Sequence, residues 1–187
     1  MSKKIKTLLV ALVMICSSSA FAKDFDWSKC WCNYGAGIEK GDVLLSVDAG
    51  LPWDFFTPFN LGGWAIPPVA VDLQVACPIW KLPFSFGGYV AGGYSQYRNY
   101  NYVYNNIPIK TGASVSYHVR MPAEPLDLYA GMKVGLAIDF GNAYPSNFYV
   151  YPDYGFNIGA SWYFGDAFGV NVELGYPMCK AGFVFHF

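Results

Sequence analysis

Apolar and polar residues alternate along most of this chain after residue 42. Between Leu126 and Ile138 every second residue is apolar, whereas the intervening positions include Asp127, Lys133 and two glycines. A period of two is typical of a β-strand with two unlike faces. The same alternation recurs along the chain and predicts eight strands, at 43–51, 69–77, 84–94, 109–119, 126–138, 154–163, 168–176 and 180–187.

Charge falls on one face of these predicted strands. Six charged residues lie on the face that also carries glycine, serine and asparagine: Asp48, Asp72, Lys110, Asp127, Lys133 and Glu173. A soluble barrel buries its aliphatic face and exposes charge to water, whereas a membrane barrel turns its aliphatic face outward. The pattern therefore predicts an all-β fold, an eight-stranded antiparallel transmembrane β-barrel.

The composition supports a membrane protein built from strands. Hydrophobic residues make up 54% of the 187 residues, aromatic residues 19% and charged residues 13%, against about 25% charged residues in an average soluble domain. No apolar stretch after Lys23 is long enough for a membrane helix, so spanning strands must close into a barrel. A net charge of −1 without a basic stripe excludes nucleic acid as a partner.

The N-terminal segment has the features of an export signal. Three lysines precede an apolar run, which ends in Ala20-Phe21-Ala22. A basic start, a short apolar core and a small-x-small end are typical of a cleaved secretory signal peptide. We therefore expect three parts: a signal peptide at 1–22, a periplasmic N-terminal arm at 23–40 and an outer-membrane barrel domain at 41–187.

The predicted connections alternate in length. The long ones span 52–67, 95–108 and 139–153. The short ones span 78–83, 120–125 and 164–167. Outer-membrane barrels have long outer loops and short periplasmic turns, so both chain ends are expected on the periplasmic side.

The end of the chain carries Phe183, Phe185 and Phe187 at alternate positions, and Trp162 to Tyr176 reads as strand, turn and strand. With the export signal and eight alternating strands, these features resemble small bacterial outer-membrane β-barrels of the OmpA transmembrane-domain, opacity-protein and OmpW-like types. The resemblance implies that the three phenylalanines are an assembly signal read by the barrel-assembly machinery. It also implies a cell outer-membrane location, surrounded by outer-membrane lipid. We further expect a monomer.

A polar cluster is predicted inside the barrel. Asp48, Asp72, Lys133 and Glu173 fall at similar depths on the inward face. Charge within a membrane is costly unless it is paired, so such residues are candidates for function. An eight-stranded barrel is just wide enough for side chains to fill it. We therefore favour a polar plug, in which Lys133 is held by the carboxylates, over a catalytic pair.

Histidine and cysteine give weaker signals. His118 shares its face with Ser114 and Ser116, but residues two apart point the same way in any strand, so we expect no enzyme and no catalytic residue. His186 is distant from His118, so no metal or cofactor is expected. The exported compartment permits a disulfide at the periplasmic end, from Cys30 or Cys32 to Cys77.

Two outer segments are candidate binding sites. The residues Tyr97, Tyr100, Tyr102 and Tyr104 alternate with asparagine and other residues, which suits either a binding loop or an extension of two strands above the membrane. The first long connection is apolar and contains Trp53, Phe55 and Phe56. We expect a membrane scaffold whose surface-exposed loops mediate adhesion or another surface interaction, in contact with a host or surface ligand. The alternative is an OmpW-like narrow channel or transporter for small hydrophobic molecules, but a lumen of glycine, serine, aspartate and asparagine favours the scaffold.

Overall fold

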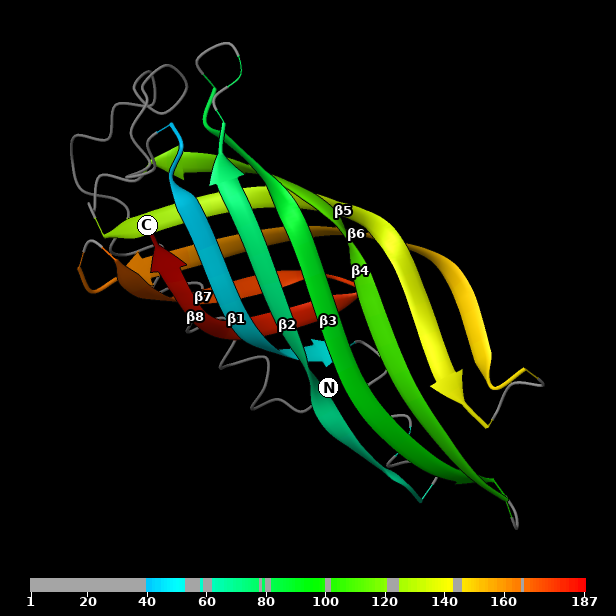
Figure 1. Ribbon diagram of the computed structural model, residues 1–187. Helices are drawn as coiled ribbons and strands as arrows, with labels where there is room; N and C mark the ends of the chain where they lie inside the picture. Colours follow the sequence, from blue (N-terminus) through cyan, green and yellow to red (C-terminus); the bar gives the residue numbers. More distant parts are fainter. Residues whose placement is uncertain are drawn as a thin grey trace.

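The computed structural model describes residues 40–52, 58, 62–77, 79, 82–99, 102–120, 125–142, 146–165 and 167–187. Their eight strands close into an antiparallel barrel in which each strand pairs with its sequence neighbours and β1 pairs with β8 (Figure 1). The strands are β1 (Val43–Pro52), β2 (Trp64–Ala76), β3 (Phe84–Asn99), β4 (Tyr102–Arg120), β5 (Leu126–Gly141), β6 (Phe148–Tyr163), β7 (Phe168–Tyr176) and β8 (Met178–His186). The predicted fold class is confirmed. Among the described residues, no helix is long and apolar enough to cross a membrane.

The interior of the barrel is polar. Among the residues that the structure describes, fifteen buried ones are polar or charged, against seven buried hydrophobic ones. The outward positions are aliphatic or aromatic and largely uncovered, as at Met132, Val134 and Ile158, which are each more than 60% exposed. The alternation of the sequence is therefore realised with its polar face inside.

The strands on one side of the barrel are much longer than those on the other side. The strands β3 to β6 have 16 to 19 residues, whereas β1, β7 and β8 have 9 or 10. About 9–11 residues suffice for a strand to cross a membrane. Figure 1 shows β3 to β6, in green to gold, running well beyond β7 and β8. We call the part of β2 to β6 beyond these short strands the extension.

The extension corrects two of the predicted long connections. The ranges 95–108 and 139–153 were expected as loops, but most of their residues belong to β3, β4, β5 and β6. The pairing of Arg98 with Val103 shows that the β3–β4 hairpin continues almost to its tip. The Tyr-rich segment is therefore an extension of two strands, one of the two interpretations open from the sequence.

The start of β2 was also predicted wrongly, at residue 69 instead of Trp64. A β-bulge lies between Ile66 and Val69, where Pro67 and Pro68 lack the N–H that a regular ladder needs. The outward residues Ile66 and Val69 are therefore three positions apart instead of two, which interrupts the alternation. Proline suits this segment because its described strand pairs are all with β3, which makes it an edge of the extension.

Candidate functional site

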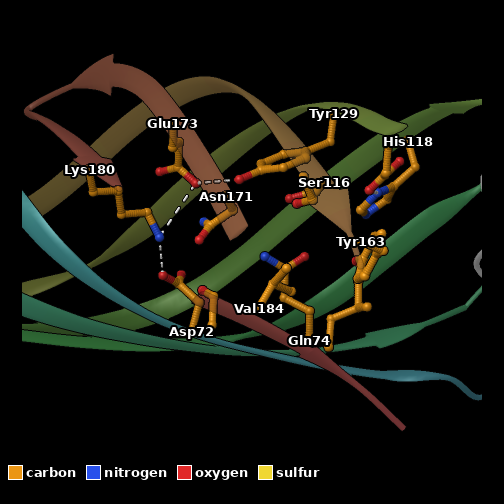
Figure 2. Close-up of a pocket in the computed structure, with 14 residues that line it drawn as sticks. Asp72, Gln74, Ser116, His118, Tyr129, Tyr163, Asn171, Glu173, Lys180 and Val184 are labelled. Atoms are coloured by element: carbon orange, nitrogen blue, oxygen red, sulfur yellow. Dashed lines mark hydrogen bonds and ion pairs between the residues drawn. The ribbon is translucent and has the colours of Figure 1, made fainter. Parts of the chain in front are cut away.

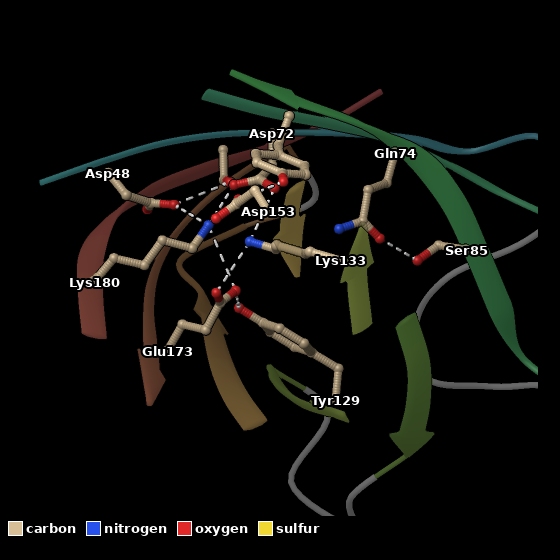
Figure 3. Close-up of polar contacts among 11 residues, drawn as sticks. Asp48, Asp72, Gln74, Ser85, Tyr129, Lys133, Asp153, Glu173 and Lys180 are labelled. Carbon is tan, nitrogen blue, oxygen red and sulfur yellow. Dashed lines mark hydrogen bonds and ion pairs between the residues drawn. The ribbon is translucent and has the colours of Figure 1, made fainter. Parts of the chain in front are cut away.

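The charged core of the lumen is a ring of alternating signs. Lys133 Nζ lies 3.1 Å from Asp72 Oδ1 and 3.1 Å from Glu173 Oε1. Lys180 Nζ contacts the second oxygen of each acid: it forms an ion pair with Asp72 Oδ2 and lies 3.4 Å from Glu173 Oε2. Each lysine thus bridges both carboxylates, and each carboxylate bridges both lysines (Figure 3). We call these four residues the lumen ring.

A third acid, Asp48 of β1, lies beside the lumen ring and pairs with Lys180. Lys180 Nζ donates to Asp48 Oδ2 at 2.8 Å, and Ser46 Oγ donates to the same oxygen at 3.2 Å. The structure therefore brings together all four residues expected in the cluster, Asp48, Asp72, Lys133 and Glu173. It adds Lys180, which the sequence analysis missed although it lies at the start of the last predicted strand. A strict count of charges on the inward face would have included Lys180.

Two aromatic side chains contact the lumen ring. Tyr129 Oη donates to Glu173 Oε2 at 3.3 Å, and Lys133 Nζ lies 5.6 Å from the centroid of the Tyr89 ring. Gly159 pairs with Tyr129 across β5 and β6, and a Cβ at residue 159 would lie 2.2 Å from Tyr129 Cζ. The missing side chain at Gly159 therefore makes the space that the tyrosine ring occupies.

A second ion pair lies nearer the extension. Lys110 Nζ lies 2.9 Å from Asp153 Oδ1, and Tyr89 Oη donates to Asp153 Oδ2 at 2.7 Å. Because Tyr89 also faces Lys133, it links this pair to the lumen ring. Charged groups consequently fill the lumen over two successive levels.

Towards the short turns, the ring borders a small cavity that Asp127 helps to line. Asn171, His118 and Tyr163 also line it (Figure 2), and its volume is about 30 Å³. This is room for about two water molecules. Within the described residues, buried Asp127 Oδ1 and Asn171 Oδ1 have no protein partner, which suits a wet cavity.

A chain of serine, histidine and aspartate lies at the same end. Ser85 Oγ lies 2.8 Å from His118 Nε2, and His118 Nδ1 lies 2.8 Å from Asp127 Oδ2. These residue types and distances match those of a hydrolytic triad. The sequence analysis paired His118 only with serines of its own strand and missed Ser85, which lies on the neighbouring strand β3.

The surroundings of Ser85 oppose a nucleophilic role. Its side chain is fully buried, and its Oγ lies 2.5 Å from Gln74 Oε1, so a substrate has no approach to that oxygen. The chain Gln74–Ser85–His118–Asp127 instead joins strands β2 to β5 at one rim of the barrel. His186 likewise joins β8 to the residue before β1, because its Nε2 lies 2.8 Å from Asp42 Oδ2. We assign these contacts a structural role.

The Tyr-rich part of the extension holds paired rings. Tyr97 and Tyr104, which are partners across β3 and β4, stack with centroids 5.2 Å apart, and Tyr102 is 70% exposed. The Asn142 side chain accepts from Asn105 N at 2.8 Å and donates to Val103 O at 2.9 Å. This amide fixes the hairpin to the end of β5. Of the remaining surface candidates, Trp53, Phe55, Phe56 and Tyr100 lie outside the described residues.

The cysteine and phenylalanine predictions concern the ends of strands. Cys77 follows β2 with an exposed, free thiol, and its expected partner Cys32 lies outside the described residues. Phe183 is outward on β8 and 51% exposed. Phe187 exchanges two backbone hydrogen bonds with Val43, of 2.9 and 3.0 Å, and so continues the β1–β8 seam past Phe185.

The distribution of charge over the two faces determines the type of barrel. Of the charged side chains described in the eight strands, only Arg98 faces outward; the others face the lumen, and most are buried there. An aliphatic exterior around a charged interior suits lipid outside and no hydrophobic core inside. The fold is that of a small outer-membrane barrel. The resemblance stated from the sequence is therefore confirmed at the level of the fold.

Comparisons with known proteins were made for the sequence and for the structure. No protein-family model and no curated protein matches the sequence. Among solved structures, the N-terminal β-barrel domain of Pseudomonas aeruginosa OprF is similar, with a TM-score of 0.46 and 13% identity over 79% of this chain and 98% of that one. Ail, the attachment invasion locus protein of Yersinia pestis, in complex with the heparin analogue sucrose octasulfate, has a TM-score of 0.44 and 7% identity over 79% of this chain and 97% of that one.

Proposed function

We propose that this protein is a monomeric scaffold in the outer membrane, which closes its own lumen and presents the extension outside the cell for surface interaction. The observation that carries the proposal is the lumen ring inside an aliphatic exterior. The exterior suits insertion into lipid, and the ring suits a barrel that does not conduct.

The lumen ring argues against the alternative function, that of a narrow channel or transporter. Lys133 and Lys180 each contact two ring carboxylates, and their side chains reach across the lumen from β5 and β8. Opening a path through the ring separates lysines from carboxylates in a site with little water, which is strongly unfavourable. The path of a small hydrophobic molecule through the barrel would cross this ring, so the alternative transporter function has little support.

The extension is suited to recognition at the surface. Tyrosine rings provide large contact areas at a low entropic cost because they have few rotatable bonds. The stacked Tyr97 and Tyr104 are held in place before any partner arrives, and Tyr102 exposes most of its surface at the start of β4. A partner therefore meets a rigid surface.

Labelling of intact cells tests the orientation. In a variant without other cysteines, Tyr102→Cys should react with a membrane-impermeant maleimide added outside. The native Cys77, kept as the single cysteine of a matched protein, is exposed at the opposite end of the barrel. It should react only after the outer membrane is permeabilised. Labelling of Cys77 alone on intact cells would contradict the proposed orientation.

Adherence of whole cells tests the surface interaction. A non-adherent bacterium that produces the protein should bind to cultured epithelial cells more than its parent does, and Tyr97→Ser with Tyr104→Ser should remove the gain. The control is Phe164→Ser, a change of another exposed aromatic residue, at a short turn. Equal adherence of the tyrosine variant and this control would contradict a role for the extension.

A further inference from the structure

Within the described strands, the outward face of the barrel has one cluster of polar side chains. Outward positions of the described strands are otherwise aliphatic, aromatic, glycine, alanine or proline, with Thr111 and Cys179 as isolated exceptions. On the extension, however, β2, β3 and β4 bring together an outward group that we call the lateral patch: Trp64, Tyr94, Gln96, Arg98 and Asn105.

The lateral patch is an ordered network. The rings of Trp64 and Tyr94 lie 5.0 Å apart. Trp64 Nε1 donates to Gln96 Oε1 at 3.0 Å, Gln96 Nε2 donates to Asn105 Oδ1 at 2.9 Å, and Tyr94 Oη donates to the same oxygen at 2.9 Å. These bonds hold both amides and both rings in fixed positions on three strands.

The network also fixes which atoms remain for a ligand. An indole N–H can only donate, so Gln96 must turn its oxygen to Trp64 and its NH₂ group to Asn105. Asn105 must then present its oxygen to Gln96, which leaves its Nδ2, with two N–H donors, without a partner in the network. The amide oxygens of the patch are thus occupied, while amide donors remain.

Arg98 adds a charge to these donors. It lies one outward position beyond Gln96 on β3, about 7 Å along the strand. No described carboxylate lies within ion-pair distance of its guanidinium, unlike the lysines of the lumen. The patch therefore offers a guanidinium, free amide donors and an indole face 44% exposed at its edge, which together suit an anionic, acceptor-rich ligand.

The position of the patch indicates what such a ligand is. Next to it, towards the middle of the barrel, the outward residues include Val69 on β2 and Ile107 on β4, which are 54% and 45% exposed and belong to the lipid-facing surface. The layer next to hydrocarbon in a bilayer is the headgroup layer, where tryptophan and tyrosine side chains concentrate. The patch faces sideways into that layer.

We propose that the lateral patch binds the phosphorylated sugar headgroup of a lipid in the outer leaflet. Arg98 pairs with a phosphate through the N–H donors of its planar guanidinium group. Asn105 Nδ2 donates to sugar oxygens, and the Trp64 ring packs against the sugar. The inference rests on the proposed function, because only a barrel in a membrane brings a headgroup to this face.

Lipid retention by the full chain in vesicles tests the inference. The protein is inserted into phosphatidylethanolamine vesicles that contain a minor share of one probe lipid: lipid A, dephosphorylated lipid A or phosphatidylglycerol. After mild detergent extraction, the lipid held by each barrel is counted by native mass spectrometry. We expect retention of lipid A to exceed that of the other two probes about tenfold, the effect of one charge-assisted hydrogen bond.

Two substitutions separate the patch from general lipid binding. Arg98→Gln removes the charge, and Asn105→Asp keeps the oxygen that Tyr94 and Gln96 use while replacing the free donors by an anion. Each should lower lipid A retention to the level of phosphatidylglycerol, whereas Thr111→Val, an outward change on β4 outside the patch, should not. Equal retention of lipid A by the parent and both patch variants would overturn the inference, as would equal retention of the three probes by the parent.

Insertion is measured in the same vesicles by reaction of Tyr102→Cys with the impermeant maleimide. A barrel that inserts without selecting lipid A refutes headgroup binding by the lateral patch and leaves the proposed function standing. A barrel that fails to insert refutes the proposed function, and the inference fails with it.

Discussion

Lys133 on β5 and Asp72 on β2 meet across the lumen, with Nζ 3.1 Å from Oδ1. The two strands are not neighbours in the barrel, so this contact crosses the interior and does not follow the wall. Asp72 also pairs with Lys180 of β8, which ties a third strand to the same carboxylate. Burial of these charges is tolerated because each of them has at least two partners.

Removal of one cation should therefore be costly. Lys133→Ala leaves Asp72 and Glu173 with Lys180 as their shared cation, and we expect a loss of about 3–5 kcal/mol in the free energy of unfolding. Urea titration of the barrel in detergent micelles, followed by tryptophan fluorescence, measures it. Lys110→Ala, whose side chain is 25% exposed and lies outside the ring, should cost less. Equal losses of unfolding free energy for the two variants would show that the lumen ring contributes no more to stability than the contacts of Lys110.

The space beside Tyr129 gives a steric prediction. Gly159→Ala places a Cβ about where the Tyr129 ring lies, and overpacking of this kind costs about 1–3 kcal/mol. Gly165→Ala, where a new Cβ meets no atom within 4 Å, is the matched control and should change stability little. A Tyr129→Leu change in the Gly159→Ala background should cost less than the two single losses added together, in the same titration.

The buried histidine is predicted to balance a buried acid. His118→Leu leaves Asp127, which is 1% exposed, without its ring partner and should destabilise the barrel by about 3–5 kcal/mol. Adding Asp127→Leu should restore much of that loss, because no buried charge is then left alone. Ser85→Ala removes the two hydrogen bonds of the hydroxyl, to Gln74 and His118, but leaves no charge unpaired, and should cost less, about 2 kcal/mol. If Ser85→Ala instead matched His118→Leu, the assignment of a charge-balancing role would be wrong.

The last residue is predicted to matter for assembly. Deleting Phe187 removes both backbone hydrogen bonds to Val43 at the seam where the barrel closes, and an open edge is costly in lipid. We expect less protein in the outer-membrane fraction and more degradation in the periplasm, measured by fractionation and immunoblotting. Phe164→Ser, at a short turn away from the seam, is the control. Unchanged membrane levels after the deletion would contradict this role for the seam.

Much of the fold was predictable because lipid and lumen impose opposite demands on alternate residues. This is why the run from Leu126 to Ile138 could be assigned from the sequence, and why Asp72 and Lys133 could be placed on one side of the wall. The search for alternating residues failed at Pro67 and Pro68, because a bulge shifts the alternation there. A period of two also does not show where a strand leaves the membrane. The extension was therefore only one of two interpretations.

The site was less predictable because it depends on neighbours across strands. The contact between Ser85 and His118 joins two strands and requires their register, which a single strand pattern does not give. The partners of Lys180 come from β1, β2 and β7 and require closure of the barrel. The lateral patch likewise needs the register of β2, β3 and β4 before Trp64, Gln96 and Asn105 become one surface.

Conductance of single barrels in planar bilayers tests the central claim most directly, which is that the lumen ring closes a membrane-inserted barrel. Insertion is first established by one-sided labelling of Tyr102→Cys. The inserted parent protein should show no steady current at moderate voltage, and a variant with Lys133→Ser and Lys180→Ser should show measurable openings. A large, steady conductance from the parent protein would contradict the account and favour a channel.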